Sequence, residues 1–399
     1  MSTVFVYEIA AVNAAVQRMK PGDPKGIYAI PFYLVIGEPG AGRSTALRAM
    51  QLTWPEGDGR VNTGLPQQYC TYWMAQEAVF IEPQKQVVGP ERDPPALGML
   101  CNELKTARPR EALDGVLLVM NVGEFADLDE SGLERYSRNM RAYLVEVVRG
   151  LDADIPVYIV VSGYDRLWGF ADVFQWNKDR MREDPWGFVM PGDVLTSDSK
   201  EKLDEEMAGL GARLEAFCLA KLSSDDPQDQ RARAYQHLSE SRLVMEKLRQ
   251  ILHVLAAGNA YERAPWLRAL TIGTATPGTG DKLRASVARF YSMGYSPPGG
   301  PPQTRPGGLP MHQFMQMVVI PDKDLVPTRT RWRDDKLLVI SFVVGGALVL
   351  ITIIVAIVFA TQSSRPGGTG RGPQRVGAID DVRGAEVAMI AGVSGAAGG

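Results

Sequence analysis

Cysteine and histidine are scarce in this 399-residue sequence, which contains only three of each. Cys70, Cys101 and Cys218 are isolated, with no CxxC pair and no Cys/His cluster. This spacing excludes a zinc-binding motif and a disulfide framework, so we expect three small buried thiols. None of the histidines has neighbours that would make it a metal ligand or a member of a catalytic triad.

An excess of positive charge is also absent. Lys and Arg number 43 against 46 Asp and Glu, which gives a net charge of −3. Without a basic stripe interleaved with aromatic residues, we expect no nucleic-acid partner. The first residues do not read as a signal peptide either, because Glu8 interrupts their apolar stretch and no basic region precedes it.

One long hydrophobic run stands near the C-terminus. Residues 337–360 contain 24 residues without a charge. As a helix they would span about 36 Å, enough to cross a hydrocarbon core of about 30 Å. Five cations precede the run and three follow it within a short distance. By the positive-inside rule this predicts a single-pass transmembrane helix with residues 1–336 in the cytoplasm.

Residues 30–195 alternate between two kinds of pattern. Short runs rich in β-branched residues predict strands, and longer stretches between and after them predict helices. The strands are expected at 33–36, 78–82, 115–122 and 157–162, and the helices at 44–51, 95–106, 132–149 and 167–177. The alternation predicts an α/β fold with a parallel-rich sheet covered by helices on both faces.

The stretch PFYLVIGEPGAGRSTAL, from residue 31, fits the phosphate-loop pattern GxxxxGK[ST] at every fixed position except the lysine. Its glycines let backbone N–H groups converge on a phosphate, and the Ser44 hydroxyl would ligate Mg²⁺. Arg43 replaces the lysine with a planar and bulkier cation. It could bind a phosphate through two nitrogens, or fold over an empty loop and take the anion site itself.

Further segments accompany this loop in a fixed order. They are CTYWMAQEAVFIE from residue 70, ARPREALDGVLLVMNVGEFADL from residue 107, DIPVYIVVSGYDRLWGFADVF from residue 154 and VVIPDKDLV from residue 318. Together they resemble the IcmF/TssM family, an inner-membrane component of bacterial type VI secretion systems. The resemblance covers about residues 30–326. It implies a P-loop GTPase-like domain and a location in the inner membrane.

The sequence departs from the family where nucleotide chemistry would take place. The family's Asp-Thr-Ala-Gly is Glu-Pro-Gln-Lys at residues 82–85, and its Thr-Lys-x-Asp is Ser-Gly-Tyr-Asp at residues 162–165. By the resemblance, Glu82 would assist Mg²⁺ and Asp165 would accept from a guanine edge. Because each nucleotide motif has lost a key side chain, we expect slow or absent hydrolysis and assign no catalytic residue.

The candidate ligand is GTP or ATP with Mg²⁺, and the loop is alternatively a shell that binds neither. Ser44 and Glu82 are the candidate Mg²⁺ ligands. The candidate nucleotide-binding residues are Gly37, Gly40, Gly42, Arg43, Ser44, Thr45 and Asp165.

We divide the chain into seven parts. Family members usually have two membrane helices before this domain and a large periplasmic region after it, and neither is expected here. The parts are an N-terminal arm (1–29), a P-loop NTPase-like domain (30–195), a mostly helical extension with a short strand at 270–273 (196–295), a Pro/Gly linker (296–310), a juxtamembrane segment (311–336), the membrane helix (337–360) and a disordered glycine-rich tail (361–399).

Three functions are compatible with these sequence features. The first is a non-enzymatic scaffold that docks TssL-like membrane subunits and cytoplasmic baseplate proteins. Its surfaces would be 199–257 and 311–320, although both could simply pack against the domain. The second is a membrane-anchored nucleotide switch. A third, a targeting GTPase resembling signal-receptor subunits, leaves the 196–290 extension unexplained.

Overall fold

The structure, a computed structural model, describes residues 1–55, 59–61, 63–174, 186–191, 199–258, 264–273 and 311–326. Residues Met1–Asp334 form one compact unit, and Asp335–Gly399 form a second. The linker 296–310, the predicted membrane helix 337–360 and the tail 361–399 lie outside the described residues. Among those that are described, no helix is both long enough and apolar enough to span a membrane.

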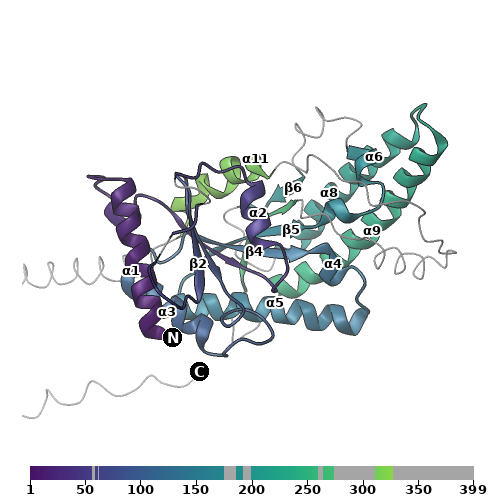
Figure 1. Cartoon of the computed structure of the whole chain (residues 1–399). Coiled ribbons are helices and arrows are strands. Elements are labelled where there is room, and N and C mark those ends of the chain that lie inside the picture. The colour runs from purple at the N-terminus through teal and green to yellow at the C-terminus, as the bar shows by residue number, and fades with distance from the viewer. Residues whose placement is uncertain are drawn as a thin grey trace, which may run out of the picture. The chain divides into compact units, whose positions relative to one another are not determined.

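A seven-stranded sheet forms the centre of the first unit (Figure 1). Its strand order is β2-β3-β1-β4-β5-β7-β6. The five inner strands are parallel, whereas β2 and β6 pair antiparallel at the two edges. The strands are β1 (Phe32–Ile36), β2 (Cys70–Met74), β3 (Val79–Pro83), β4 (Gly115–Asn121), β5 (Pro156–Ser162), β6 (Gly187–Val189) and β7 (Trp266–Ile272).

The four strands predicted within residues 30–195 are confirmed to within one or two residues. The short strand predicted at 270–273 is part of β7, which begins four residues earlier, at Trp266. The two edge strands were not predicted. β2 joins β3 through a tight turn in which the Ala75 amide bonds the Ala78 carbonyl at 2.9 Å. That turn contains no Gly, Pro or Asn, the residues that normally mark a hairpin. β6 spans only three residues, too few for an alternating pattern to be recognised.

The helices confirm most of the predicted stretches. α6 covers only part of the helix predicted over 167–177, and residues 175–177 lie outside the described part of the chain. The helices are α1 (Ser2–Met19), α2 (Arg43–Ala49), α3 (Ala96–Ala107), α4 (Val122–Phe125), α5 (Glu130–Leu151), α6 (Phe170–Phe174), α8 (Ser199–Leu222), α9 (Gln228–Ala256) and α11 (His312–Phe314), with short helical turns η1 (Gly26–Tyr28), η2 (Tyr164–Arg166), η3 (Met315–Val319) and η4 (Pro321–Asp324).

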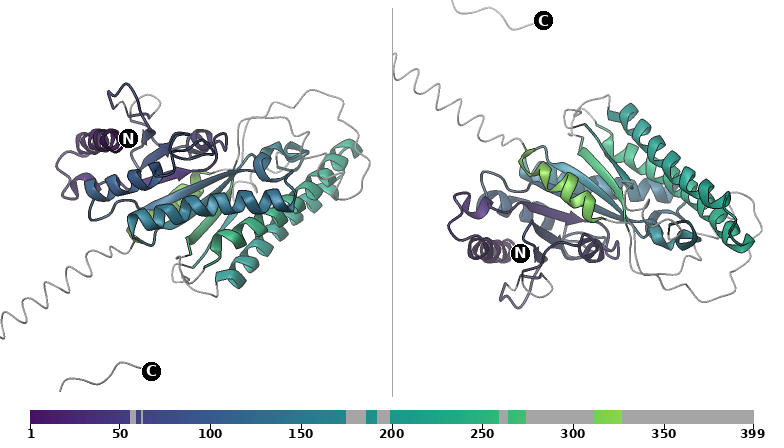
Figure 2. Two further views of the ribbon diagram at one scale, coloured as in Figure 1. Left: turned by 90° about the horizontal axis from the view of Figure 1, so that it is seen from below. Right: turned by 90° about the horizontal axis from the view of Figure 1, so that it is seen from above.

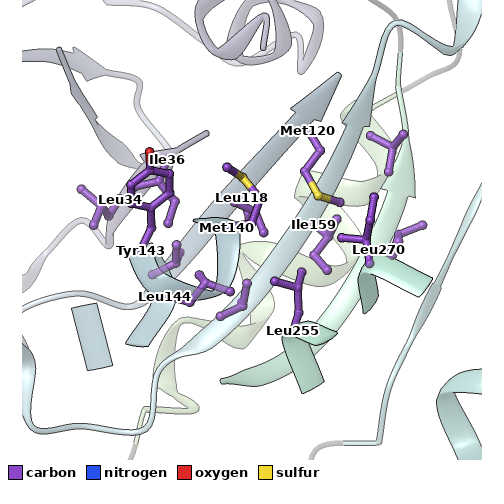
Figure 3. Packing of buried hydrophobic residues seen from close by; sticks show 14 of the residues in the cluster. Leu34, Ile36, Leu118, Met120, Met140, Tyr143, Leu144, Ile159, Leu255 and Leu270 are labelled. Carbon is purple, nitrogen blue, oxygen red and sulfur yellow. The ribbon is translucent and has the colours of Figure 1, made fainter. Parts of the chain in front are cut away.

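Each inner strand divides its apolar side chains between two faces of the sheet. Leu34 and Ile36 face one core, in which α1, α3, α5 and α9 take part, while Tyr33 and Val35 face the other. Figure 3 shows the first core, where Met140 and Leu144 of α5 lie against β1, β4 and β5. Because both faces are buried, the strands read as continuous apolar runs.

α5 shows why this layer forms. Asp129 caps its first turn by accepting the Gly132 amide at 2.8 Å. Its buried residues recur at three- and four-residue spacing, which places them on one helical stripe. The helix ends at Leu151, and the next residue, Asp152, adopts a left-handed conformation with φ of 50°.

The second face is covered by α2 and by residues 311–326, which we call the strap. Figure 2 shows α5 and the strap on opposite faces of the sheet. The strap starts beside Gly273, where an added Cβ would lie 2.3 Å from the Met311 sulfur. Further along, the Tyr33 hydroxyl donates to the Val319 carbonyl at 2.7 Å. For the stretch 311–320, packing against the domain is therefore what the structure shows.

Candidate functional site

The phosphate-like loop follows β1 at the carboxyl edge of the parallel strands. β1 lies between β3 and β4, so the loop sits where the strand order reverses, which is where α/β sheets usually bind ligands. Gly37 has φ of 150°, and a Cβ there would lie 2.2 Å from the Val119 carbonyl oxygen. Only glycine fits that approach. Gly40 and Gly42 are also left-handed, with φ of 98° and 84°.

Arg43 begins α2, and its guanidinium contacts two residues at the end of β3. Its Nη1 donates to the Pro83 carbonyl at 2.8 Å, and its Nε lies 3.6 Å from Oε1 of Glu82. The side chain is 10% exposed. Burial lowers the pKa of Arg43, and the charge of Glu82 partly opposes that effect. The structure thus gives Arg43 a protein carboxylate as its anion.

Ser44 and Glu82, the candidate Mg²⁺ ligands, are hydrogen-bonded to each other. The Ser44 hydroxyl lies 3.0 Å from both carboxylate oxygens of Glu82. The Trp73 indole N–H donates to Oε2 of the same carboxylate at 2.9 Å. Glu82 therefore has three protein partners: a hydroxyl, an indole and a guanidinium. Thr45, the next candidate, is half-buried in the first turn of α2.

Trp73 was not identified as a site residue from the sequence, although it lies in one of the family-like segments. It is 1% exposed. The Arg48 and Arg60 guanidinium carbons lie 5.5 and 4.9 Å from its ring centroid, and the Trp54 ring centroid is 6.1 Å away. This packing fixes the indole N–H on Glu82.

Two further carboxylates lie near the loop, on the side of α5. Glu38, inside the loop, accepts from the Tyr143 hydroxyl at 3.2 Å, and burial raises its pKa. Glu124 accepts from the Tyr136 hydroxyl at 3.1 Å and is part of the capping box that Asn121 starts. Burial raises the pKa of Glu124 to about 7. The Asn-x-x-Glu spacing is a signal that could have identified this second glutamate.

The segment after β3 borders the loop, and the charge of its Arg92 partly opposes the rise that burial causes in the pKa of Glu38. Lys85, at the position of the glycine in the family's Asp-Thr-Ala-Gly, pairs at the surface with Glu91 at 3.2 Å and has a side chain that is 63% exposed. Behind it, Gly89 passes so close to the loop that a Cβ would lie 2.8 Å from a ring carbon of Pro39. This segment therefore packs against the loop tip through backbone and proline.

Residues 162–165 stand where the family has its base-reading Thr-Lys-x-Asp, and here they make contacts within the protein. The Ser162 hydroxyl donates to the Ala41 carbonyl of the loop at 2.5 Å. Tyr164 is fully buried and donates to Ser241 of α9 at 2.8 Å. Asp165 is half-buried in η2 at the same edge of the sheet, separated from the loop by β4. The fold thus brings the loop residues and Glu82 together and places Asp165 across β4.

Comparison with known proteins now identifies the family. The family described as IcmF-related N-terminal domain matches residues 90–346, well over half of the chain. The chain belongs to this family. The match begins after the loop, so the assignment does not depend on the altered phosphate motif.

A curated relative of this IcmF-related chain is the type VI secretion system component TssM1 of Pseudomonas aeruginosa. The two are 26% identical over 295 residues, which is 70% of this chain and 27% of the relative. The chain therefore spans about a quarter of the length of that relative.

Two solved structures show weaker likeness. A complex of SsGBP with GDP is 13% identical, with a TM-score of 0.21 over 50% of this chain and 45% of that one. A mutation variant of SsGBP is 12% identical, with a TM-score of 0.20 over 39% and 45%. At these scores neither supports a statement about the fold or the ligand of the IcmF-related chain.

The Arg-Pro-Arg segment at residues 108–110, which also carries the resemblance, is structural in this IcmF-related chain. Arg108 is buried, with its guanidinium 3.7 Å from the Phe32 ring centroid and 4.8 Å from that of Tyr28. Burial lowers its pKa to about 10. Nearby, Asp114 accepts the Phe32 amide at 2.7 Å. These contacts hold the start of β1, at the edge opposite the loop.

Proposed function

We propose that this chain is a membrane-anchored structural subunit of a type VI secretion membrane complex. Its degenerate nucleotide-binding domain would dock TssL-like membrane subunits and cytoplasmic baseplate proteins. The family assignment and the TssM1 relative support the secretion role. The anchor in this proposal is residues 337–360, with the N-terminal domain in the cytoplasm of the bacterial inner membrane.

The observation that carries the non-enzymatic role is the contact set of Arg43 and Ser44. Phosphoryl transfer depends on positioning and on positive charge directed at the transferred group. Here the Arg43 guanidinium contacts Glu82 and donates to the Pro83 carbonyl, and the Ser44 hydroxyl lies against the Glu82 carboxylate. Turnover would require both side chains to leave these contacts.

The docking surface we propose is the hairpin of α8 and α9. Its helices leave a groove of about 350 Å³ between them, whose lining includes Met207, Leu214 and Met245. Near the hairpin tip, Leu219 and Tyr235 are 45% and 54% exposed. Large apolar side chains at the surface are common in protein interfaces.

The experiment compares loop and hairpin variants of the full chain in a strain that lacks it. We expect Ser44→Ala to support secretion as the native chain does, and Leu219→Asp with Tyr235→Ala to reduce it at equal protein level. Loss of secretion in Ser44→Ala, with the hairpin variant unaffected, would refute the docking role.

A second candidate is a switch that binds GTP or ATP with slow or no hydrolysis. The left-handed glycines at positions 37, 40 and 42 and the strand-loop-helix order favour it. In this case the loop residues and Asp165 would bind the nucleotide. The test compares the binding of labelled GTP and ATP to the full chain and to its Gly42→Val variant. Equal binding by the variant would exclude the loop as the nucleotide-binding site.

A further inference from the structure

The Glu82 carboxylate is the group whose partners decide whether a divalent cation fits this loop. Mg²⁺ prefers near-ideal octahedral oxygen coordination and needs free carboxylate lone pairs. The Ser44 hydroxyl lies 3.0 Å from both oxygens of Glu82, and the Trp73 indole N–H donates to Oε2 at 2.9 Å, so each oxygen already faces a protein donor. Within the described residues, no group of three or more His, Cys, Asp or Glu could hold a metal ion.

Arg43 places a positive charge next to the position that the metal would take. Its Nε lies 3.6 Å from Oε1 of Glu82, and both side chains are largely buried, at 10% and 12% exposure. Repulsion between two cations rises steeply when water is excluded. The Pro83 carbonyl holds Nη1 at 2.8 Å, which keeps the guanidinium beside the carboxylate.

Trp73 differs from an ordinary hydrogen-bond partner because it can only donate. An indole N–H offers no lone pair to a metal. Arg48 and Arg60 lie against its ring, so two more positive charges surround the Trp73–Glu82 pair. Moving the ring aside would also break the close packing of a side chain that is 1% exposed.

The other carboxylates near the loop do not replace Glu82 as metal ligands. Glu38 and Glu124 accept hydrogen bonds from tyrosines of α5, on the first face of the sheet. Burial raises the pKa of both carboxyl groups, that of Glu124 to about 7, which favours the uncharged form relative to an exposed glutamate.

We infer that Arg43 and Trp73 keep divalent cations away from Ser44 and Glu82. A phosphate-bearing ligand of this loop would accordingly be held without a metal ion. The inference rests on the proposed nucleotide loop and is independent of the docking role. It differs from the expectation that Ser44 and Glu82 ligate Mg²⁺.

The test measures Mn²⁺ binding to the full chain in detergent by electron paramagnetic resonance, with and without GTP. The variants are Arg43→Lys, and Arg43→Lys combined with Trp73→Phe. Arg60→Lys is the matched control, because it keeps a positive charge near Trp73 and leaves Arg43, Ser44 and Trp73 in place around Glu82. Ser44→Ala, made in the native chain and in each variant, locates the ion.

We expect the native chain and Arg60→Lys to show no Ser44-dependent Mn²⁺ at about 1 mM ion. The double variant should bind at least about tenfold more tightly, a gain that Ser44→Ala removes. If the double variant does not fold, Arg43→Lys alone should gain at least about threefold. Ser44-dependent Mn²⁺ in the native chain, or no gain in the folded variants, overturns the inference. Neither result changes the secretion phenotype that tests docking.

Discussion

Tyr158 and Asp322, 164 residues apart in the sequence, are joined by a 3.1 Å hydrogen bond on the second face of the sheet. The same carboxylate accepts from Nε and Nη2 of Arg268 in β7, at 2.8 and 3.2 Å. With the bond from Tyr33 to Val319, these contacts fasten the strap across β1, β5 and β7.

Breaking the ion pair between Asp322 and Arg268 is expected to release the strap. Asp322→Ala leaves the Arg268 guanidinium, which is 15% exposed, without its carboxylate. Removing one partner of a buried ion pair costs about 3–5 kcal/mol. We therefore expect a loss of about 3 kcal/mol of unfolding free energy in urea, with faster proteolysis near residue 311. Lys85→Ala is the control: its partner Glu91 is exposed, so we expect a change below about 1 kcal/mol. Equal losses in both variants would contradict the account.

Glu124 should make stability depend on pH. Its pKa is about 7 in the folded chain against a usual 4.5. Between these values the unfolded chain releases a proton that the folded chain keeps, so the free energy of unfolding falls as pH rises through this window. Glu124→Gln removes the effect. We expect it to be about 1–3 kcal/mol more stable than the native chain at pH 8 and similar to it at pH 4. A difference that is constant with pH would refute this.

Substitutions at two loop glycines distinguish the stability cost of a steric clash from the cost of a left-handed backbone. Gly37→Ala and Gly40→Ala both require a left-handed alanine, which costs about 1–2 kcal/mol. Only position 37 also forces a Cβ against the Val119 carbonyl, whereas nothing lies within 4 Å of a Cβ at position 40. We expect Gly37→Ala to lose at least about 2 kcal/mol more than Gly40→Ala in thermal melts. Equal losses would show that the loop does not pack against β4.

The thiols should be unreactive in the folded chain. Cys70, Cys101 and Cys218 are free and buried, as the sequence predicts. Burial raises the pKa of Cys218 to about 12 and raises those of the other two as well. We expect no reaction with Ellman's reagent at pH 8 until the chain unfolds, because the thiolate is the reactive species. Rapid labelling of any native thiol would contradict the burial described.

Local patterns predicted the inner strands and the long helices because burial on both sheet faces produces continuous apolar runs. They did not predict β2, because its turn at Ala75–Ala78 lacks hairpin residues. The strap's position depends on contacts between residues more than 160 positions apart, such as Tyr158 and Asp322. No local pattern encodes such pairs.

The sequence predicted only those features of the candidate site that depend on local spacing. The spacing of its glycines and Ser44 is local, and the structure gives these glycines the left-handed conformations that the motif requires. The partner of Arg43 is not local: Glu82 and Pro83 meet it only because β3 pairs with β1. The sequence therefore left two roles open for Arg43. The tertiary contact favours a third, an ion pair with the chain's own carboxylate.

The measurement that tests the central claim most directly is Mg²⁺-dependent release of phosphate from GTP and ATP by the purified full chain. The account predicts no turnover above that of Ser44→Ala, because Arg43 and Ser44 are bound to Glu82 and Pro83. Turnover that requires Mg²⁺ and is abolished by Ser44→Ala would contradict it and establish a working nucleotide enzyme.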